Sequence, residues 1–209
     1  MISAPAPAKI NLALAVGETR PDGRHEVATL LQRVELADTI SLGPAAQLAV
    51  EGFPADTLVR DALAAVAAAA GVEPRWRARL EKRIPVAAGL GGGSSDAATA
   101  LRLACELLDA APPPERLHAI AAGLGADVPF FLAPGPACAT GDGTLLSRVE
   151  LPQDYSVLLV LPRGERKHST AEVYDRFAGA GGFAAPSPQS GARVRGRSIP
   201  TPGAHRRTC

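Results

Sequence analysis

The sequence predicts an α+β fold, because strand and helix patterns follow one another in a mixed order that never repeats as strand–helix–strand units. Residues 75–81 alternate charged and apolar side chains, which is typical of a strand with one solvent-facing side. Residues 96–108 repeat apolar side chains at helical spacing. Hydrophobic residues make up 46% of the 209 residues, so the chain can bury a core.

The other elements follow from local patterns and turn residues. Pro21, Asp22 and Gly23 form a strong turn signal between two apolar runs. Asp56 or Thr57 can cap a helix that ends at Gly71. The expected elements are strands at 10–16, 29–36 and 40–42, a helix at 58–70, a strand at 75–81, helices at 96–108 and 115–122 (ended by Gly123), and a buried strand at 157–161.

Composition limits the classes of function. The net charge is +1, which gives no general attraction to nucleic acid or membrane. The three cysteines form no paired motif and no metal-ligand spacing, so we expect a cytoplasmic protein with no protein-built metal site. From residue 179 onward Gly, Ala, Pro, Ser and Arg dominate, and we expect residues 179–209 to be a disordered basic tail.

A glycine-rich stretch between the strand at 75–81 and the following helix carries the clearest chemistry. Glycines let the backbone approach an anion closely, and the next helix offers unpaired N–H groups at its start. We read Gly89–Ser95 as a loop and Asp96 as the first helical residue. The predicted ATP-phosphate cradle consists of Pro85, Val86, Ala87, Ala88, Gly89, Leu90, Gly91, Gly92, Gly93, Ser94 and Ser95.

Two familiar nucleotide motifs do not fit this stretch. The GxxxxGK[ST] loop requires a lysine after the glycines, and none follows. The GxGxxG pattern begins at Gly89 and Gly91 but meets Ser94 at its last position. A cradle without its own lysine needs a cation from elsewhere, and Lys9 is one of three lysines in the chain. By themselves, Lys9 is compatible with a solvated lysine and Asp127 with a turn or capping residue.

Together these segments resemble the GHMP kinase superfamily, and within it the family of 4-diphosphocytidyl-2-C-methyl-D-erythritol kinases. The resemblance runs from about residue 5 to about residue 177. The matching stretches are Pro5-Ala-Pro-Ala-Lys-Ile-Asn-Leu12, Pro21-Asp-Gly-Arg-His-Glu26, residues 85–97 and Leu124-Gly-Ala-Asp-Val-Pro-Phe130.

The resemblance implies a fold and a reaction. The fold would be a GHMP kinase N-terminal domain of the ribosomal protein S5 domain 2-like type. The reaction would be ATP- and Mg²⁺-dependent phosphorylation of the 2-hydroxyl of the cytidine-diphosphate derivative of methylerythritol, in isoprenoid (terpenoid) biosynthesis. Asp127 would take or orient the hydroxyl proton, and Lys9 would offset charge in the transition state. Asn11, His25 and Tyr174 would contact the substrate.

The sequence also departs from the family. Arg24 stands where relatives commonly have Tyr, and Thr57 where many have Asn. No third glycine-rich motif follows residue 177. We therefore expect an N-terminal ATP-binding domain at 1–150 and the start of a C-terminal ferredoxin-like lobe at 151–178, with the rest of that lobe missing. The alternatives are another GHMP-type kinase, for example one acting on homoserine or mevalonate, or a non-catalytic nucleotide-binding remnant. The sequence does not indicate an oligomeric state.

Overall fold

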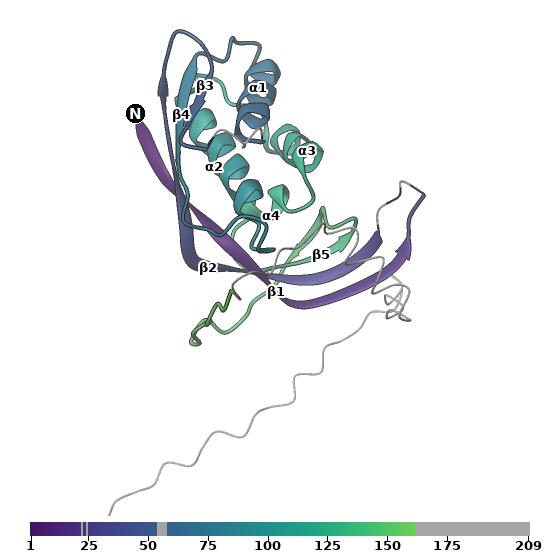
Figure 1. The fold of residues 1–209 in the computed structure, drawn as a ribbon. Helices are drawn as coiled ribbons and strands as arrows, with labels where there is room; N and C mark the ends of the chain where they lie inside the picture. The colour runs from purple at the N-terminus through teal and green to yellow at the C-terminus, as the bar shows by residue number, and fades with distance from the viewer. Residues whose placement is uncertain (22, 24, 54–57, 162–209) are drawn as a thin grey trace, which may run out of the picture.

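The computed structural model describes residues 1–21, 23, 25–53 and 58–161, and its strands form one mixed sheet. The elements are β1 (Ile2–Thr19), β2 (His25–Pro44), β3 (Ala49–Glu51), α1 (Leu58–Ala70), β4 (Trp76–Glu81), α2 (Gly92–Leu107), α3 (Pro114–Leu124), α4 (Val128–Leu132), β5 (Ala137–Gly141) and β6 (Leu145–Arg148). The strand order is β3-β4-β2-β5-β6, with β1 also paired to β2. Among the described strands only β3 and β4 pair in parallel, and the helices gather on one face (Figure 1), which confirms the α+β prediction.

Strand β2 joins the two parts of the sheet. Its residues 39–44 pair with β4, whereas its residues 27–31 pair with β5. Strand β1 follows it antiparallel along almost its whole length, so the two form a long hairpin that bends away from the helices (Figure 1). The separate strands expected at 29–36 and 40–42 are therefore one continuous strand.

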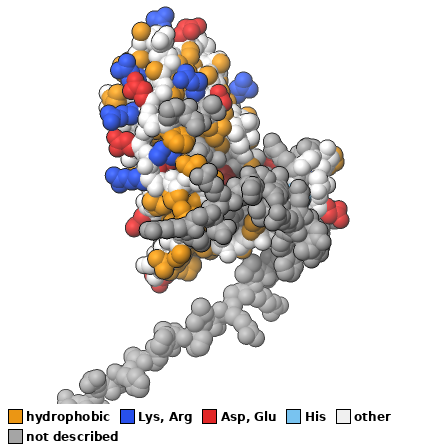
Figure 2. All heavy atoms as spheres, viewed as in Figure 1, with side chains coloured by type: hydrophobic (Ala, Val, Ile, Leu, Met, Phe, Trp, Pro, Cys, Tyr) orange, Lys and Arg blue, Asp and Glu red, His pale blue; other side chains and the backbone are white. Residues whose placement is uncertain are grey.

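The core lies between the sheet and the helices, and β4 shows why. Trp76, Ala78 and Leu80 are buried beneath the helices, as their alternation predicts. The other face of β4 is exposed, and there Arg77 forms an ion pair with Glu51, with its Nε 3.3 Å from Glu51 Oε1. Figure 2 shows charged side chains of both signs interspersed over the region of β3, β4 and α1. Helix α2 is buried on nearly every side along residues 95–104, rather than on one stripe as the pattern predicts, because it lies at the centre of the helical layer.

The start of α2 differs from the sequence prediction. The helix begins at Gly92, four residues before Asp96, so part of the expected loop forms its first turn. Glycine is a poor helix former, and that propensity argued against a helix here. The helix nevertheless forms here, and a Cβ at Gly92 would lie 3.2 Å from Ile84 Cγ2, which favours glycine at this position. The glycine is needed for close approach of backbone and side chain.

Other helices and strands also differ from the sequence prediction. Helix α3 continues past Gly123 to Leu124, so that glycine is not its end. Residues 157–161 are not a buried strand: Leu158 is 86% exposed, and no described strand pairs with them. Apolarity alone predicted burial there, but a strand also needs hydrogen-bonding neighbours. The sequence reading missed β3, β5, β6 and α4, which are short and, in β5, built mainly from small residues.

Several predictions fall on residues outside the described part of the chain. They concern Asp22, Arg24, the helix start at 54–57, Tyr174 and the tail at 179–209. The predicted domain boundaries stay predictions as well. None of the described helices is long and apolar enough to cross a membrane.

Candidate active site

The glycine-rich loop connects β4 to α2 and has an unusual backbone. Ala87, Gly89 and Gly91 have positive φ angles of 60°, 77° and 69°. For alanine this left-handed conformation costs about 1–2 kcal/mol, so the fold holds Ala87 against a local preference. Turns of this kind direct backbone N–H groups toward a common concavity, where an anion can bind.

The start of α2 supplies further donors to this concavity. Gly91 is the N-cap residue, and no side chain caps the helix. The first intrahelical bond runs from the Ser95 N–H to the Gly91 carbonyl at 2.9 Å. The three preceding amides, of Gly92, Gly93 and Ser94, therefore have no acceptor within the helix. Together with the helix dipole they favour a bound anion.

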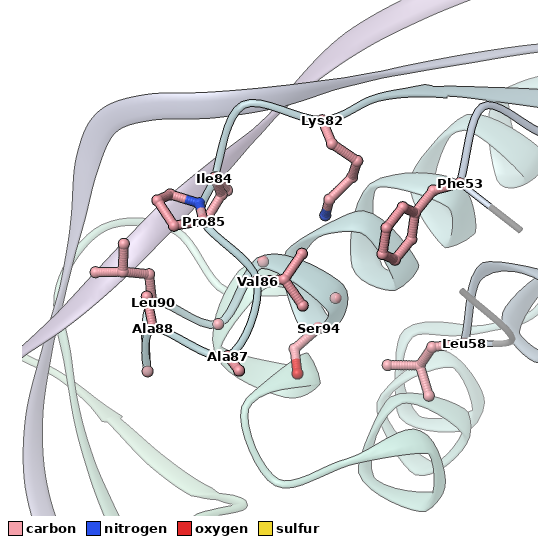
Figure 3. A pocket seen from close by; sticks show the side chains of 14 residues that line it. Phe53, Leu58, Lys82, Ile84, Pro85, Val86, Ala87, Ala88, Leu90 and Ser94 are labelled. Atoms are coloured by element: carbon pink, nitrogen blue, oxygen red, sulfur yellow. The ribbon is translucent and has the colours of Figure 1, made fainter. Parts of the chain in front are cut away.

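A pocket of about 380 Å³ opens beside the loop (Figure 3). Ten of the eleven predicted cradle residues line it, namely residues 85–94. Ser95 does not: it is fully buried in α2 and faces the interior. The sequence reading missed the remaining lining residues, which are Phe53, Leu58, Lys82 and Ile84. In Figure 3 the Lys82 side chain and the Phe53 ring face each other at one end of the pocket. The Lys82 Nζ lies 5.7 Å from the centroid of that ring.

Lys9 and Asp127 lie together at the end of the loop. The Lys9 Nζ is 3.4 Å from Asp127 Oδ2, although the residues come from β1 and from the N-cap of α4. The Lys9 N–H donates to the Leu90 carbonyl at 2.9 Å, which ties β1 to the loop. A register shift between Pro7 and Lys9 interrupts the strand's alternation, so Ala8 and Lys9 are both buried. The structure therefore brings the predicted catalytic pair beside the cradle.

Asn11 holds the ammonium group of Lys9 from the other side. Its Oδ1 accepts a hydrogen bond from Lys9 Nζ at 2.8 Å, and its Nδ2 donates to Thr29 Oγ1 at 2.7 Å. The Thr29 hydroxyl in turn donates to the Ala13 carbonyl at 2.8 Å. This chain of contacts fixes the direction of the Lys9 side chain. The predicted contact of Asn11 with substrate stays a prediction.

Arg33 supports the helix that carries Asp127. It is the cross-strand partner of Lys9 in the β1–β2 register. Its guanidinium donates to the carbonyls of Phe130 and Ala133 at the C-terminal end of α4, the first at 2.7 Å. Burial, and then the nearby charge of Arg102, lower the pKa of Arg33 from its ordinary value. Arg33, a half-buried cation, thus links the strand that carries Lys9 to the helix that carries Asp127.

Comparisons with known proteins show which family this chain resembles. Residues 57–135, which include α1, β4, the loop and α4, match the family described as GHMP kinases N terminal domain. These residues are therefore similar to the N-terminal domain of GHMP kinases. A 4-diphosphocytidyl-2-C-methyl-D-erythritol kinase of Salinibacter ruber is 43% identical over 189 residues, and one of Pelotomaculum thermopropionicum is 45% identical over 186. These matches cover 84% and 85% of this chain but 65% and 64% of the relatives.

Solved structures of two kinases have a fold similar to that of this chain. A crystal structure of 4-(cytidine 5′-diphospho)-2C-methyl-D-erythritol kinase matches with a TM-score of 0.65 at 43% identity, over 72% of this chain and 56% of that one. A mevalonate kinase matches with a TM-score of 0.54 at 12% identity, over 72% and 56%, and shows the fold alone. The resemblance of this sequence to the first of these kinase families is confirmed.

The residue predicted to contact the substrate base lies away from the loop. His25 begins β2 near the tip of the long hairpin, with its Nε2 3.5 Å from Thr19 Oγ1. It does not line the pocket beside the loop. Tyr174 is outside the described residues.

A buried charged cluster was missed by the sequence reading. Lys82 Nζ donates to Asp38 Oδ2 at 2.6 Å and to Asp96 Oδ2 at 2.5 Å, and both carboxylates are fully buried. Burial lowers the pKa of Lys82, but these hydrogen bonds and charges outweigh it and raise that pKa above its ordinary 10.5. The available signal was Asp38 itself, a charged residue within the apolar pattern of a strand.

Proposed function

We propose that this chain is an ATP-dependent kinase that phosphorylates the 2-hydroxyl of 4-diphosphocytidyl-2-C-methyl-D-erythritol, a step of non-mevalonate isoprenoid biosynthesis. The observation that carries the proposal is that one ion pair, Lys9 with Asp127, lies against the end of a glycine-rich phosphate cradle. The two relatives described above, at 43% and 45% identity, carry the name of this enzyme.

The cradle fits the phosphates of a nucleotide. Its concavity depends on glycine, since a Cβ at Gly91 would lie 3.0 Å from Lys9 Cγ and 3.1 Å from Phe131 Cζ. The amides at the start of α2 would donate to phosphate oxygens, and the Ser94 hydroxyl lies in the same pocket. The remainder of the pocket, toward Phe53 and Leu58, offers an apolar surface for the nucleoside.

Phosphoryl transfer depends on positioning and charge more than on covalent chemistry. Asp127 would accept the proton of the substrate hydroxyl or orient it for attack. Lys9 would stabilise the charge that develops on the transferring group, with Asn11 fixing its direction. Each role requires that the two side chains stay within a few ångströms of one another, as they are here.

Mg²⁺ would arrive with the nucleotide. Among the described residues no three acidic, His or Cys side chains form a cluster that could hold a metal. Magnesium in kinases is usually held by one or two carboxylates together with substrate phosphates, where it neutralises phosphate charge. The Ser94 hydroxyl, which lines the pocket, is the side-chain oxygen that we assign to it.

The other parts of the proposal concern substrate and setting. His25, Asn11 and Tyr174 are the proposed contacts for the substrate, with His25 and Tyr174 on the cytosine. Residues 1–150 are the proposed ATP-binding domain, and residues 151–178 the proposed start of a second lobe. We propose a cytoplasmic location, because Cys105 and Cys138 are free thiols that a reducing compartment preserves.

Transfer of label from radiolabelled ATP tests the function directly. The protein should be in excess over acceptor, so that one slow turnover is detected, and the acceptors should be the cytidine substrate, mevalonate and homoserine. We expect label on the cytidine substrate alone. Label on mevalonate or homoserine would support another GHMP-type kinase, and ATP binding without any transfer would support a non-catalytic remnant.

A further inference from the structure

The buried charges behind the phosphate loop come from three separate elements. Asp38 lies in β2, Lys82 directly follows β4, and Asp96 lies in α2. Both carboxylates are fully buried, and the Lys82 side chain is 16% exposed. Burying three charges is costly unless each is paired and hydrogen-bonded. Because this costly cluster lies beside a ligand pocket, we looked for a role in ligand binding as well as in packing.

Asp38 continues the sheet by means of its side chain. The β2–β4 pairing ends at Thr39 opposite Glu81. Just past that pair, Asp38 Oδ1 accepts the N–H groups of Arg83 and Ile84, the second at 2.8 Å. The carboxylate thus replaces the strand partner that these two residues lack. It fixes the backbone immediately before the loop begins at Pro85.

The same cluster reaches the far end of the loop. Asp38 Oδ2 and Asp96 Oδ2 share the ammonium of Lys82, and Asp96 belongs to the second turn of α2. A Cβ on Gly92, the first residue of that helix, would lie 3.5 Å from Asp38 Oδ2 and 3.2 Å from Ile84 Cγ2. One buried network therefore contacts both the residues that enter the loop and the helix that leaves it.

The charges are also ordered relative to the pocket. Lys82 lines the pocket, whereas Asp38 and Asp96 do not. In Figure 3 the Lys82 side chain reaches from the end of β4 toward the start of α2. The cation thus stands between the two carboxylates and the pocket. Without it, their negative charge would oppose an anion in the cradle.

We propose that Asp38, Lys82 and Asp96 are positioning residues for the phosphate loop. They hold its entry at 83–84 and its exit at Gly92 at the spacing that aims the first amides of α2 into the pocket. The proposal rests on the proposed function, because it concerns how that loop binds a nucleotide. None of the three residues is assigned a direct part in the transfer.

Asp38→Asn is the sharpest test because it conserves shape. An amide offers one acceptor where the carboxylate offers two, so its NH₂ must face either Lys82 or the two backbone N–H groups. We expect ADP affinity, measured by calorimetry, to fall about 10- to 100-fold, the range for one lost charge-assisted hydrogen bond. Asp96→Asn is the milder variant if Asp38→Asn does not fold. Lys82→Arg should retain more affinity than Lys82→Met.

Thr99→Ala provides the matched control for a purely structural effect. Thr99 is buried in α2 one turn beyond Asp96 and bonds Arg102 rather than the loop. We expect it to lower the melting temperature and leave ADP affinity unchanged. If the Asp38 and Asp96 variants behaved in the same way, losing melting temperature but no affinity, the positioning role would be overturned.

Amide hydrogen exchange in the ligand-free chain separates this inference from the proposed function. Asp38→Asn should speed exchange at Arg83, Ile84 and along the loop to Gly92, while α3 keeps its protection. If the wild-type chain binds no ADP, the kinase proposal fails. Faster loop exchange in Asp38→Asn would still support the cluster as the structure that positions the loop. Unchanged exchange across residues 83–92 overturns the inference whatever the nucleotide does.

Discussion

Gly91 is the position where the structure makes its most quantitative prediction. It is the N-cap of α2, with φ at +69°, and it packs against the buried side chains of Lys9 and Phe131. Alanine there adds one carbon 3.0 Å from Lys9 Cγ and 3.1 Å from Phe131 Cζ. Neither neighbour can retreat easily, because Lys9 is 7% exposed and Phe131 is 5% exposed.

Two costs add for Gly91→Ala. A left-handed backbone conformation costs a residue with a Cβ about 1–2 kcal/mol. Overpacking a closed site costs about 1–3 kcal/mol more. The free energy of unfolding should therefore fall by about 2–5 kcal/mol. Because the clash displaces Lys9, the 3.4 Å separation from Asp127 should also change.

Gly93→Ala is the matched control in the same turn. A Cβ at Gly93 meets nothing within 4 Å, and its φ angle is not positive. Replacing glycine by alanine within a helix stabilises by up to about 1 kcal/mol. Gly92→Ala should fall between the two, since Ile84 Cγ2 lies 3.2 Å from its Cβ position. Urea denaturation followed by circular dichroism gives all three unfolding free energies.

From most to least stable, the predicted order is thus Gly93→Ala, wild type, Gly92→Ala and Gly91→Ala. Equal stability for the Gly91 and Gly93 variants would refute the packing argument. It would mean that the loop does not lie against Lys9 and Phe131 in solution.

The other predictions test the supports of the site. Arg33→Lys should lower turnover about 10-fold or more with little change in ADP affinity, because a lysine cannot hold the end of α4 that keeps Asp127 in place; an unchanged kcat would show that α4 needs no such anchor. His25→Ala should raise the KM for the cytidine substrate far more than that for ATP, and equal rises would count against its assignment to the substrate. As the pH rises, the stability difference between wild type and Lys82→Met should shrink only above the ordinary lysine pKa of 10.5, because the raised folded-state pKa keeps the ammonium charged. A difference that already shrinks below that pH in urea titrations would contradict the hydrogen bonds to Asp38.

Local signals account for the elements that the sequence could predict. The alternation of residues 75–81 and the alanine-rich run at 58–70 predicted β4 and α1 with nearly correct bounds. The loop was recognisable because a run of glycines between a strand and a helix is typical of an anion-binding turn. By contrast, α4 and β5 are five residues each, too short for a periodic pattern to stand out.

What the sequence could not show depends on contacts between distant residues. Lys82 and Asp38 are 44 positions apart, and a lone lysine after a strand is usually solvated. The start of α2 at Gly92 runs against the low helix propensity of glycine, so no local pattern indicates it. Lys9 and Asp127 could be paired beforehand only through the family resemblance, since their separation along the chain carries no local signal.

The measurement that tests the account most directly is label transfer from ATP by Asp127→Asn beside the wild-type chain, with protein in excess over the cytidine substrate. We predict transfer by the wild type and a rate at least ~100-fold lower in the variant, the low end for loss of a positioned acid–base group. ADP affinity by calorimetry should be the same in both, because Asp127 does not line the pocket beside the loop. Transfer by Asp127→Asn at the wild-type rate would contradict the assignment of Lys9 and Asp127 as the catalytic pair.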